Sequence, residues 1–298
     1  MIRTLLTAVI CSAAFCSTLG ASILGYALTS FPTNTDYVEV DNLAALRALP
    51  YYRALRGRFS GESLQEAQTV LFQLGISEAQ VEEIAIGSNA NATYGLAAGT
   101  FSRRDPAIKA RLKLYAVKLF DTDLYCVGRA TCVTFLEDWM VAFGTPESLK
   151  SVLLARQGVL TALSGNTEAV RLFESEDKAA PVRGVLFGDD LQSALSKTFQ
   201  QWFGKLAQSV KFPAAISGVG YSVTFGTTAH LRATLQCSSR NGAALLAQTL
   251  NALSLLQSVT ASSAASRDSF GFERAKASAD GSRVSLAADV RVSGARRE

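Results

Sequence analysis

Histidine is almost missing from this chain, since His230 is the single one among 298 residues. A zinc site built on a pair of histidines is therefore excluded, and a Ser-His-Asp triad would have to use His230. Ser222 in GYSVT matches the G-x-S-x-G elbow of hydrolases only in part, because Thr224 replaces the last glycine. The sequence thus predicts no catalytic residues, no metal and no cofactor.

Charge and proline are also scarce. Charged residues make up 18% of the chain, with 29 basic and 25 acidic side chains and a net charge of +4. Binding to nucleic acid needs a denser array of positive charge, so we predict no nucleic-acid partner. The six prolines provide no proline-rich linker, whereas 48% hydrophobic residues supply ample material for packed cores.

No charged side chain lies between Arg3 and Asp36. As a helix, residues 5–31 would extend about 40 Å, which exceeds the roughly 30 Å of the hydrocarbon layer of a bilayer. We therefore expect residues 1–31 to be a retained transmembrane anchor, with a signal segment cleaved after Leu19-Gly20-Ala21 as the alternative. Because Arg3 precedes the segment and acidic residues follow it, we expect a single-pass protein. Its N-terminus would be cytoplasmic and its bulk periplasmic or extracellular.

Small residues recur at every fourth position of this segment, namely Ala13, Ser17, Ala21 and Gly25. Such a stripe allows a second helix to approach closely in lipid, where close packing is one of the main sources of helix association. The stripe predicts contact with a partner transmembrane helix or a larger membrane complex. Alanine-rich export segments also produce such stripes by chance, and the sequence leaves both interpretations open.

After residue 32 the hydrophobic pattern alternates between a period of about two and a period of about 3.6, as in strands and helices. Each half of the chain follows the order strand, helix, two strands, helix, further strands. We therefore predict an α+β protein with an N-terminal transmembrane helix followed by two ferredoxin-like βαββαβ halves with antiparallel sheets. The expected divisions are residues 1–31 (anchor or signal segment), 32–160 (first half), 161–180 (helical connector) and 181–298 (second half).

Several boundaries carry specific signals. We expect helix caps at Asn42, Asp105 and Thr145, and a hairpin turn at Asp280-Gly281. The run up to residue 120 fits both periods, and we interpret it as a strand from about residue 112. A long helix is expected to pack its aromatic stripe in the core, with a ligand pocket as the alternative; the stripe consists of Phe199, Trp202 and Phe203.

Three motifs carry a resemblance to known proteins: YGLAAGTF (94–101), FLEDWMVAFGTPESLKSVL (135–153) and DGSRVSLAADV (280–290). They resemble a group of uncharacterised bacterial exported proteins with an N-terminal anchor and two ferredoxin-like halves. The resemblance covers most of residues 37–298. It implies this fold but no activity, because the motifs are packing and turn signals.

Cys126 and Cys132 are separated by five residues, which places them opposite each other if the segment forms a hairpin. Outside the cytoplasm they would be oxidised, so we expect a disulfide, with two free buried thiols as the alternative. Cys237 is expected to be a buried thiol on a strand.

Positive charges gather in one region around residues 103–118. We interpret them as a basic surface, which is either a solvated face or a contact for lipid headgroups or an acidic partner. Its members are Arg103, Arg104, Lys109, Arg111, Lys113 and Lys118.

These observations favour a non-enzymatic, membrane-anchored accessory or scaffolding subunit of a cell-envelope or membrane protein complex. An exported binding module that holds a small apolar ligand between its two halves is the alternative. A hydrolase that uses serine or carboxylates is the third and weakest hypothesis.

Overall fold

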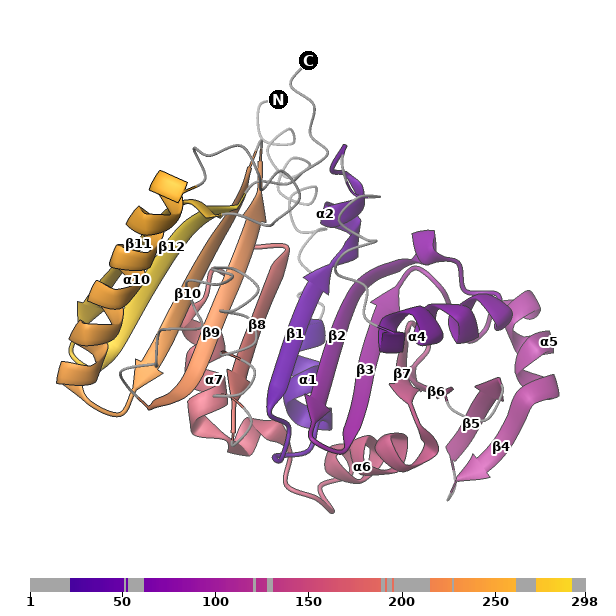
Figure 1. Ribbon diagram of the computed structural model, residues 1–298. Helices are drawn as coiled ribbons and strands as arrows, with labels where there is room; N and C mark the ends of the chain where they lie inside the picture. The colour runs from indigo at the N-terminus through magenta and orange to yellow at the C-terminus, as the bar shows by residue number, and fades with distance from the viewer. Residues whose placement is uncertain are drawn as a thin grey trace, which may run out of the picture.

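The computed structural model describes residues 22–50, 52, 62–119, 122–127, 131–188, 191, 195, 215–226, 228–260 and 272–290. Within these residues twelve strands form one continuous sheet (Figure 1). Their order across the sheet is β11-β12-β10-β9-β8-β1-β2-β3-β7-β6-β5-β4. All neighbouring strands pair antiparallel.

The strands fall into two groups that meet where β1 pairs with β8. The first group contains β1 (Tyr37–Asn42), β2 (Val81–Asn89), β3 (Ala92–Gly99), β4 (Ala116–Leu119), β5 (Thr122–Val127), β6 (Thr131–Glu137) and β7 (Met140–Gly144). The second contains β8 (Val182–Phe187), β9 (Ile216–Phe225), β10 (Ala229–Cys237), β11 (Phe272–Asp280) and β12 (Arg283–Val290).

Helices cover both faces of the sheet. One face, called the α1 face below, carries α1 (Ile23–Ser30), α6 (Pro146–Arg156), η2 (Leu163–Gly165) and α7 (Thr167–Ser175), which share a core with Val38 and Val40. The other, called the α10 face, carries α2 (Leu43–Arg47), α4 (Glu62–Gln73), α5 (Pro106–Tyr115) and α10 (Arg240–Thr260) in two further cores. A 3-10 turn, η1 (Glu78–Gln80), precedes β2.

The helix signals read from the sequence are confirmed where they can be inspected. The Asn42 side chain accepts a hydrogen bond from Ala45 N, Asp105 accepts from Ala107 N and Thr145 accepts from Ser148 N. The β11–β12 hairpin turns at Gly281, whose φ of 58° lies in the left-handed region that glycine adopts at little cost. These local rules therefore fix the ends of elements well.

The expected strand from residue 112 is wrong. Helix α5 continues through Tyr115, and β4 begins only at Ala116. Ile108 and Leu112 are buried one helical turn apart against the core under α4, and this contact decides between the two periods. The aromatic stripe of Phe199, Trp202 and Phe203 lies outside the described residues.

The predicted transmembrane helix is also wrong. Residues 1–21 lie outside the described part of the chain, and the rest of the expected span is the eight-residue helix α1. Ile23, Ala27 and Phe31 are almost fully buried against the sheet, so these apolar residues serve the protein core. Among the described residues, no helix combines the length and apolar character needed to cross a bilayer.

The prediction of two ferredoxin-like halves is wrong, because the twelve described strands form one sheet. A helix that crosses over a sheet in a β-α-β unit joins parallel strands, whereas β1 and β2 are antiparallel although α2 and α4 lie between them. The order of elements does recur, because β1-β2-β3-β7-β6 and β8-β9-β10-β12-β11 run outward from the junction in the same manner. The sequence pattern thus predicted a succession of strands and helices, but it did not determine the direction in which strands pair.

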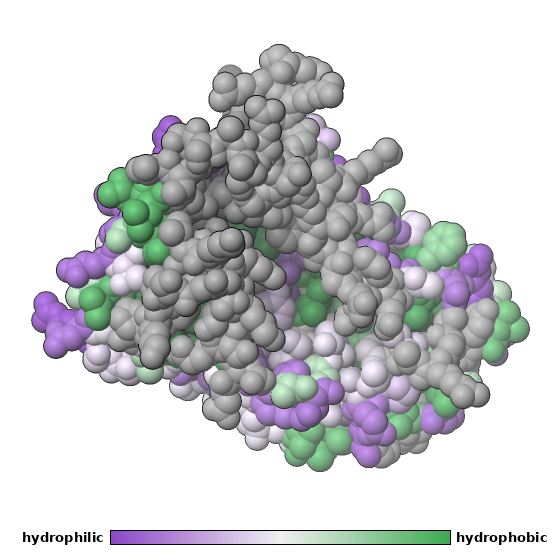
Figure 2. All heavy atoms as spheres, viewed as in Figure 1, coloured by the Kyte–Doolittle hydropathy of each residue, from purple (hydrophilic) through white to green (hydrophobic). Residues whose placement is uncertain are grey.

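Hydrophobic side chains remain exposed at the C-terminal end of α10, where Leu255 and Leu256 are 67% and 50% exposed. Figure 2 shows hydrophobic surface at the upper left of the view, where Figure 1 places this end of α10. The opposite face of the helix buries Leu246, Leu250 and Leu253 against the sheet.

Two glycines in the sheet make room for aromatic rings on the neighbouring strand. A Cβ on Gly95 would lie 2.1 Å from a Phe143 ring carbon, and a Cβ on Gly184 would lie 2.5 Å from the Tyr221 ring. Gly95 pairs with Phe143 and Gly184 pairs with Tyr221, so each ring lies across its glycine partner. The glycine at 184 allows Tyr221 to reach from β9 over β8 to β1.

We predict that Gly184→Ala lowers the free energy of unfolding by about 1–3 kcal/mol, because the added methyl group displaces Tyr221 from a packed position. Gly25→Ala is the matched control, since a Cβ there meets no atom within 4 Å. Because Gly25 lies in the first turn of α1, this control should raise stability by at most roughly 0.5–1 kcal/mol. Urea denaturation of both variants measures the difference, and equal effects would contradict the role of Gly184.

Candidate functional site

A pocket of about 660 Å³ opens on the α1 face of the second strand group. The end of α7 forms one wall, and β9, β10, β12 and β11 form the floor. Most of its side chains are polar; the lining residues are Ser175, Glu176, Asp177, Ser222, Arg232, Ala233, Thr234, Lys276, Ser278, Ser285, Leu286 and Ala287.

The position of α7 creates this pocket. Helix α7 packs on β8 and β9, while α10 covers β10, β11 and β12 from the opposite face. Side chains alternate between the faces of a strand, so β10 buries Ala233 and Leu235 under α10 and presents Arg232 and Thr234 to the other side. Beyond α7 the polar half of these strands is therefore accessible beside a helical wall.

Glu176 is the most unusual residue of the pocket, because its side chain is only 6% exposed. Its carboxylate lies over Gly220, where a Cβ would come within 2.7 Å of Oε1. Within the described residues this Oε1 accepts no hydrogen bond. Burial raises the pKa of Glu176, and the nearby hydroxyl groups of Ser222, Thr234 and Ser175 act in the opposite direction.

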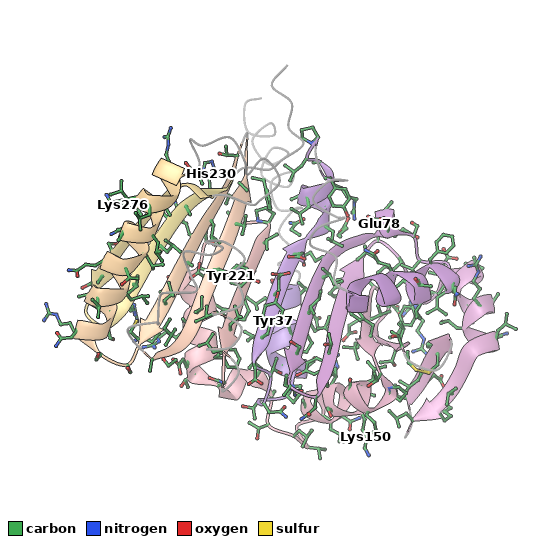
Figure 3. All side chains as sticks on the ribbon, viewed as in Figure 1. Tyr37, Glu78, Lys150, Tyr221, His230 and Lys276 are labelled. Carbon is green, nitrogen blue, oxygen red and sulfur yellow. A yellow bond between two sulfur atoms is a disulfide. The ribbon has the colours of Figure 1, made fainter. Side chains whose placement is uncertain are left out.

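A second group of buried polar residues lies on the α10 face where β1 meets β8. Tyr37 and Tyr221 lie side by side there (Figure 3), with 3.2 Å between their hydroxyl oxygens. The Tyr221 hydroxyl donates a hydrogen bond to Glu39 Oε2. Asp41, two residues along the same strand, lies on the same face, and its Oδ1 is buried without a hydrogen-bond partner among the described residues.

Tyr37, Glu39, Asp41 and Tyr221 form an acid–tyrosine cluster, and burial raises the pKa of all four groups. It raises the pKa of Glu39, while hydrogen bonds from Tyr221 and Tyr37 act against the shift. The pKa of Asp41 is raised well above its usual value by burial and then by the Glu39 charge. The pKa values of Tyr37 and Tyr221 are raised mainly by burial, so both phenols stay protonated and can donate.

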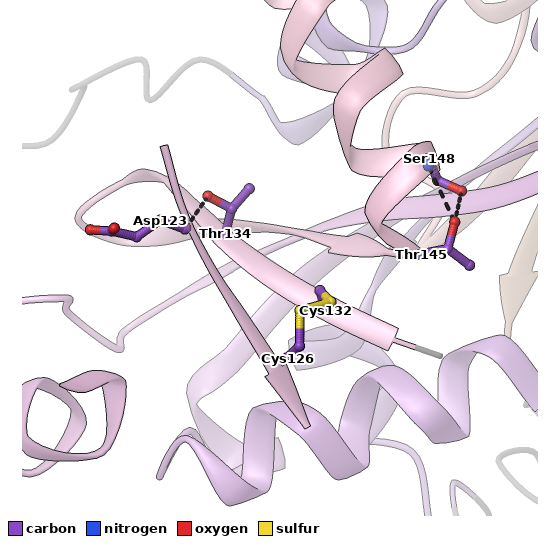
Figure 4. The surroundings of a disulfide bond; sticks show 6 residues. All are labelled: Asp123, Cys126, Cys132, Thr134, Thr145 and Ser148. Atoms are coloured by element: carbon purple, nitrogen blue, oxygen red, sulfur yellow. Dashed lines mark hydrogen bonds between the residues drawn. A yellow bond between two sulfur atoms is a disulfide. The ribbon is translucent and has the colours of Figure 1, made fainter. Parts of the chain in front are cut away.

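The predicted disulfide is present between Cys126 on β5 and Cys132 on β6 (Figure 4). The two residues are directly paired in the register of these strands, and their Cα atoms lie 4.1 Å apart. Cys237 is a free, buried thiol at the end of β10, as the sequence indicated. Burial raises the pKa of Cys237, which keeps it in the thiol form.

The predicted basic surface is partly paired with acidic side chains in the folded protein. Arg103 and Lys118 approach Asp123 at 3.7 and 2.6 Å, and Arg104 approaches Asp138 at 2.6 Å. Arg111 donates to the backbone carbonyl groups at the end of α4. Lys109 and Lys113 lie on the exposed side of α5. Three of the six cations therefore have a nearby carboxylate.

The remaining sequence candidates do not converge on one site. Gly25 lies on the exposed side of α1, whereas Ala13, Ser17 and Ala21 fall outside the described residues. His230 Nδ1 lies 2.6 Å from Asp289 Oδ1, but its Nε2 faces the Thr228 hydroxyl at 3.3 Å. Ser222, which a triad would require, is buried beside Glu176. Among the described residues no three His, Cys, Asp or Glu side chains form a metal cluster.

Similarity to known proteins is limited to solved structures. No family model and no curated protein matches the chain. Crystal forms I, III and IV of TP0453, a Treponema protein, have related structures with 10% sequence identity and TM-scores of 0.49, 0.49 and 0.48. They cover 89% of this chain and 92%, 93% and 92% of that chain. A likeness at this level carries no argument about ligand, partner or activity.

We predict that Asp41→Asn raises the free energy of unfolding at pH 8 by about 1–3 kcal/mol, because it removes the charge of a carboxylate whose Oδ1 is buried without a hydrogen-bond partner. When the pKa of an acid is higher in the folded protein than in the unfolded chain, the protein loses stability as the pH rises. The loss begins at the unfolded pKa of about 3.9 and is complete above the folded pKa. The gain should therefore be much smaller at pH 4, where the folded carboxyl group is protonated and the unfolded one is only about half ionised.

Asp280→Asn is the control for this measurement, because Asp280 is exposed and lies at the end of β11, outside the acid–tyrosine cluster. Urea denaturation at pH 4 and pH 8 gives the four free energies. A stabilisation by Asp41→Asn that is equal at both pH values would show that Asp41 is ionised throughout.

Proposed function

We propose that this protein is an exported, non-enzymatic binding protein that holds a small polar ligand in the pocket beside α7. The observation that carries this proposal is Glu176, a buried acidic residue that lines an open pocket of mostly polar side chains. A carboxyl group is costly to bury, and a ligand donor that reaches Glu176 from the pocket would offset part of that cost.

The pocket supports a different ligand from the one expected for a binding module. We expected an apolar molecule between the two halves, but the described pocket lies within one strand group and is lined by hydroxyl and charged groups. Ligand sites generally combine a concave surface with a few converging polar groups. A polar ligand therefore suits this pocket better than an apolar one.

The accessory or scaffolding role stays a prediction, and one observation favours it as a second candidate. Arg111 on α5 donates to the carbonyl oxygen of Phe72, so the end of α4 lies beside α5. Phe72, Leu114 and Val117 near this edge of the sheet are 71%, 76% and 54% exposed. An apolar group of this kind suits contact with another protein. Such contact would use the folded surface, because α1 belongs to the core.

Export is supported by the Cys126–Cys132 disulfide and by the uncharged N-terminal run. Because α1 buries Ile23 and Ala27 in the protein core, cleavage after Ala21 is favoured over a retained anchor. The mature chain would then begin at Ser22, whose side chain caps α1 by accepting a hydrogen bond from Leu24 N.

We predict that the native, secreted protein has a mass corresponding to a chain that begins at Ser22. Intact-mass measurement of the protein from its own cells, with N-terminal peptide mapping, provides the test. Replacing Ala21 with Arg should block processing and leave the larger precursor, while Ala27→Ser within the core should not alter the cleavage site. Recovery of native protein that still carries residues 1–21 would contradict cleavage.

We predict that the natively purified protein carries a small molecule that native mass spectrometry can release and weigh. Ala287→Trp should abolish its presence, because Ala287 is exposed in the pocket floor and an indole there fills the pocket. Ala279→Trp is the matched control, since Ala279 is exposed on β11 but does not line the pocket. If no molecule is released, or if both variants retain it, the binding function is wrong.

A further inference from the structure

The floor of the pocket contains two positive charges held apart by a small residue. In the register of the strands, Arg232 on β10 pairs with Ala287 on β12, and Ala287 pairs with Lys276 on β11. Directly paired residues point to the same face, so the two cations flank Ala287. Strands lie about 4.8 Å apart, which places the two Cα atoms roughly 10 Å from each other. The methyl group of Ala287 leaves the space between them open.

Arg232 and Lys276 make no ion pair with any acid in the described part of the chain. Both are exposed, and the groups beside them in the same row are the small residues Ser222 and Ala287. This arrangement contrasts with Arg103, Arg104 and Lys118, each of which has a nearby carboxylate. Two cations with an open space between them form a receptor for an anionic group.

The next row of the floor consists of hydroxyl groups. Thr234 on β10 pairs with Ser285 on β12, and Ser285 pairs with Ser278 on β11. This row lies about 7 Å from the row of cations, because the two rows are two positions apart along each strand. At the β9 end of the row, Thr234 pairs with Gly220, over which the Glu176 carboxyl group lies.

A ligand that satisfies both rows must carry an anionic group and several hydroxyl groups. Serine and threonine hydroxyls both donate and accept, and the acidic residue Glu176 lines the far end of the pocket. A neutral sugar would leave the cations without a partner, and an inorganic anion would leave the hydroxyl row and Glu176 without one.

We propose that the pocket binds a small hydroxylated organic anion, a sugar acid or a sugar phosphate, whose anionic group lies between Arg232 and Lys276. Its hydroxyl groups lie over Thr234, Ser285 and Ser278 and donate to Glu176. This inference rests on the proposed function, and it names the ligand class of the same pocket.

Isothermal titration calorimetry on the purified full chain after exhaustive dialysis tests the class directly. The probes are D-glucuronate, glucose 6-phosphate, D-glucose, L-serine and inorganic phosphate. We expect one of the first two to bind at least about tenfold more tightly than the other three, since only these two can make charge-assisted hydrogen bonds and fill the hydroxyl row together. The better of the two distinguishes a carboxylate from a phosphate ligand.

Arg232→Gln and Lys276→Gln should each weaken binding of the preferred anion about tenfold or more. Glu176→Gln should also weaken binding, because it removes the carboxylate that accepts from the ligand's hydroxyl groups. Arg283→Gln is the matched control, because Arg283 is an exposed arginine on β12 and does not line the pocket. Circular dichroism and the urea midpoint establish that each variant is folded.

The outcomes separate the ligand class from the binding function. If D-glucose or L-serine binds as tightly as the anions, or if Arg283→Gln weakens binding as much as Arg232→Gln, the ligand class is wrong while the binding function stands. If phosphate alone binds as tightly as the organic anions, the hydroxyl row has no role and the inference fails. If no probe binds and no molecule is released from the native protein, both proposals fail.

Discussion

The antiparallel pairing of β1 with β8 joins two strand groups that would otherwise each end in an open edge, and Tyr221 holds this junction. Its ring lies over Gly184 on β8 and its hydroxyl donates to Glu39 on β1, so one side chain spans three adjacent strands. On the other face, Val38, Val40 and Val185 share one core with α1. An unpaired edge at either strand would expose a row of backbone N–H and C=O groups.

The junction is polar on the α10 face although an apolar one would cost less to bury. Glu39 and Asp41 both have raised pKa values, which means that the folded protein disfavours their ionised forms. A hydrogen bond from Tyr221 to Glu39 provides something that apolar packing lacks, namely a fixed register. A shift of one residue between β1 and β8 would move Glu39 to the α1 face and bury it among valines. The charge therefore opposes misalignment of the two strand groups.

The sequence predicted those features that depend on neighbouring residues. Asn42, Asp105 and Thr145 cap helices as expected, and the Cys126–Cys132 hairpin and the turn at Gly281 follow from spacing and turn chemistry. What it missed depends on long-range pairing. No local pattern distinguishes β1–β2 as antiparallel neighbours from a crossover pair, and an apolar run such as Ile23–Ser30 packs equally well in lipid or in a protein core.

The pocket residues were missed for a related reason. Arg232, Lys276 and Ser285 lie on three strands and come together only through the order β10-β12-β11, in which the last two strands are reversed. A signal for them existed in the alternation of β10 and β12, because polar residues at every second position predict an accessible face. Glu176 had no such signal, since it follows the last turn of α7 and becomes buried only through Gly220.

Strand β9 connects the pocket with the junction. Tyr221 points to the α10 face and holds β1, while its neighbours Gly220 and Ser222 point to the α1 face and receive Glu176. A shift of β9 along β8 that broke the Tyr221–Glu39 hydrogen bond would also move Gly220 from beneath the Glu176 carboxyl group. The geometry of the pocket therefore depends on the register of the junction, and a ligand that binds Glu176 would stabilise the pairing of the two strand groups through this one strand.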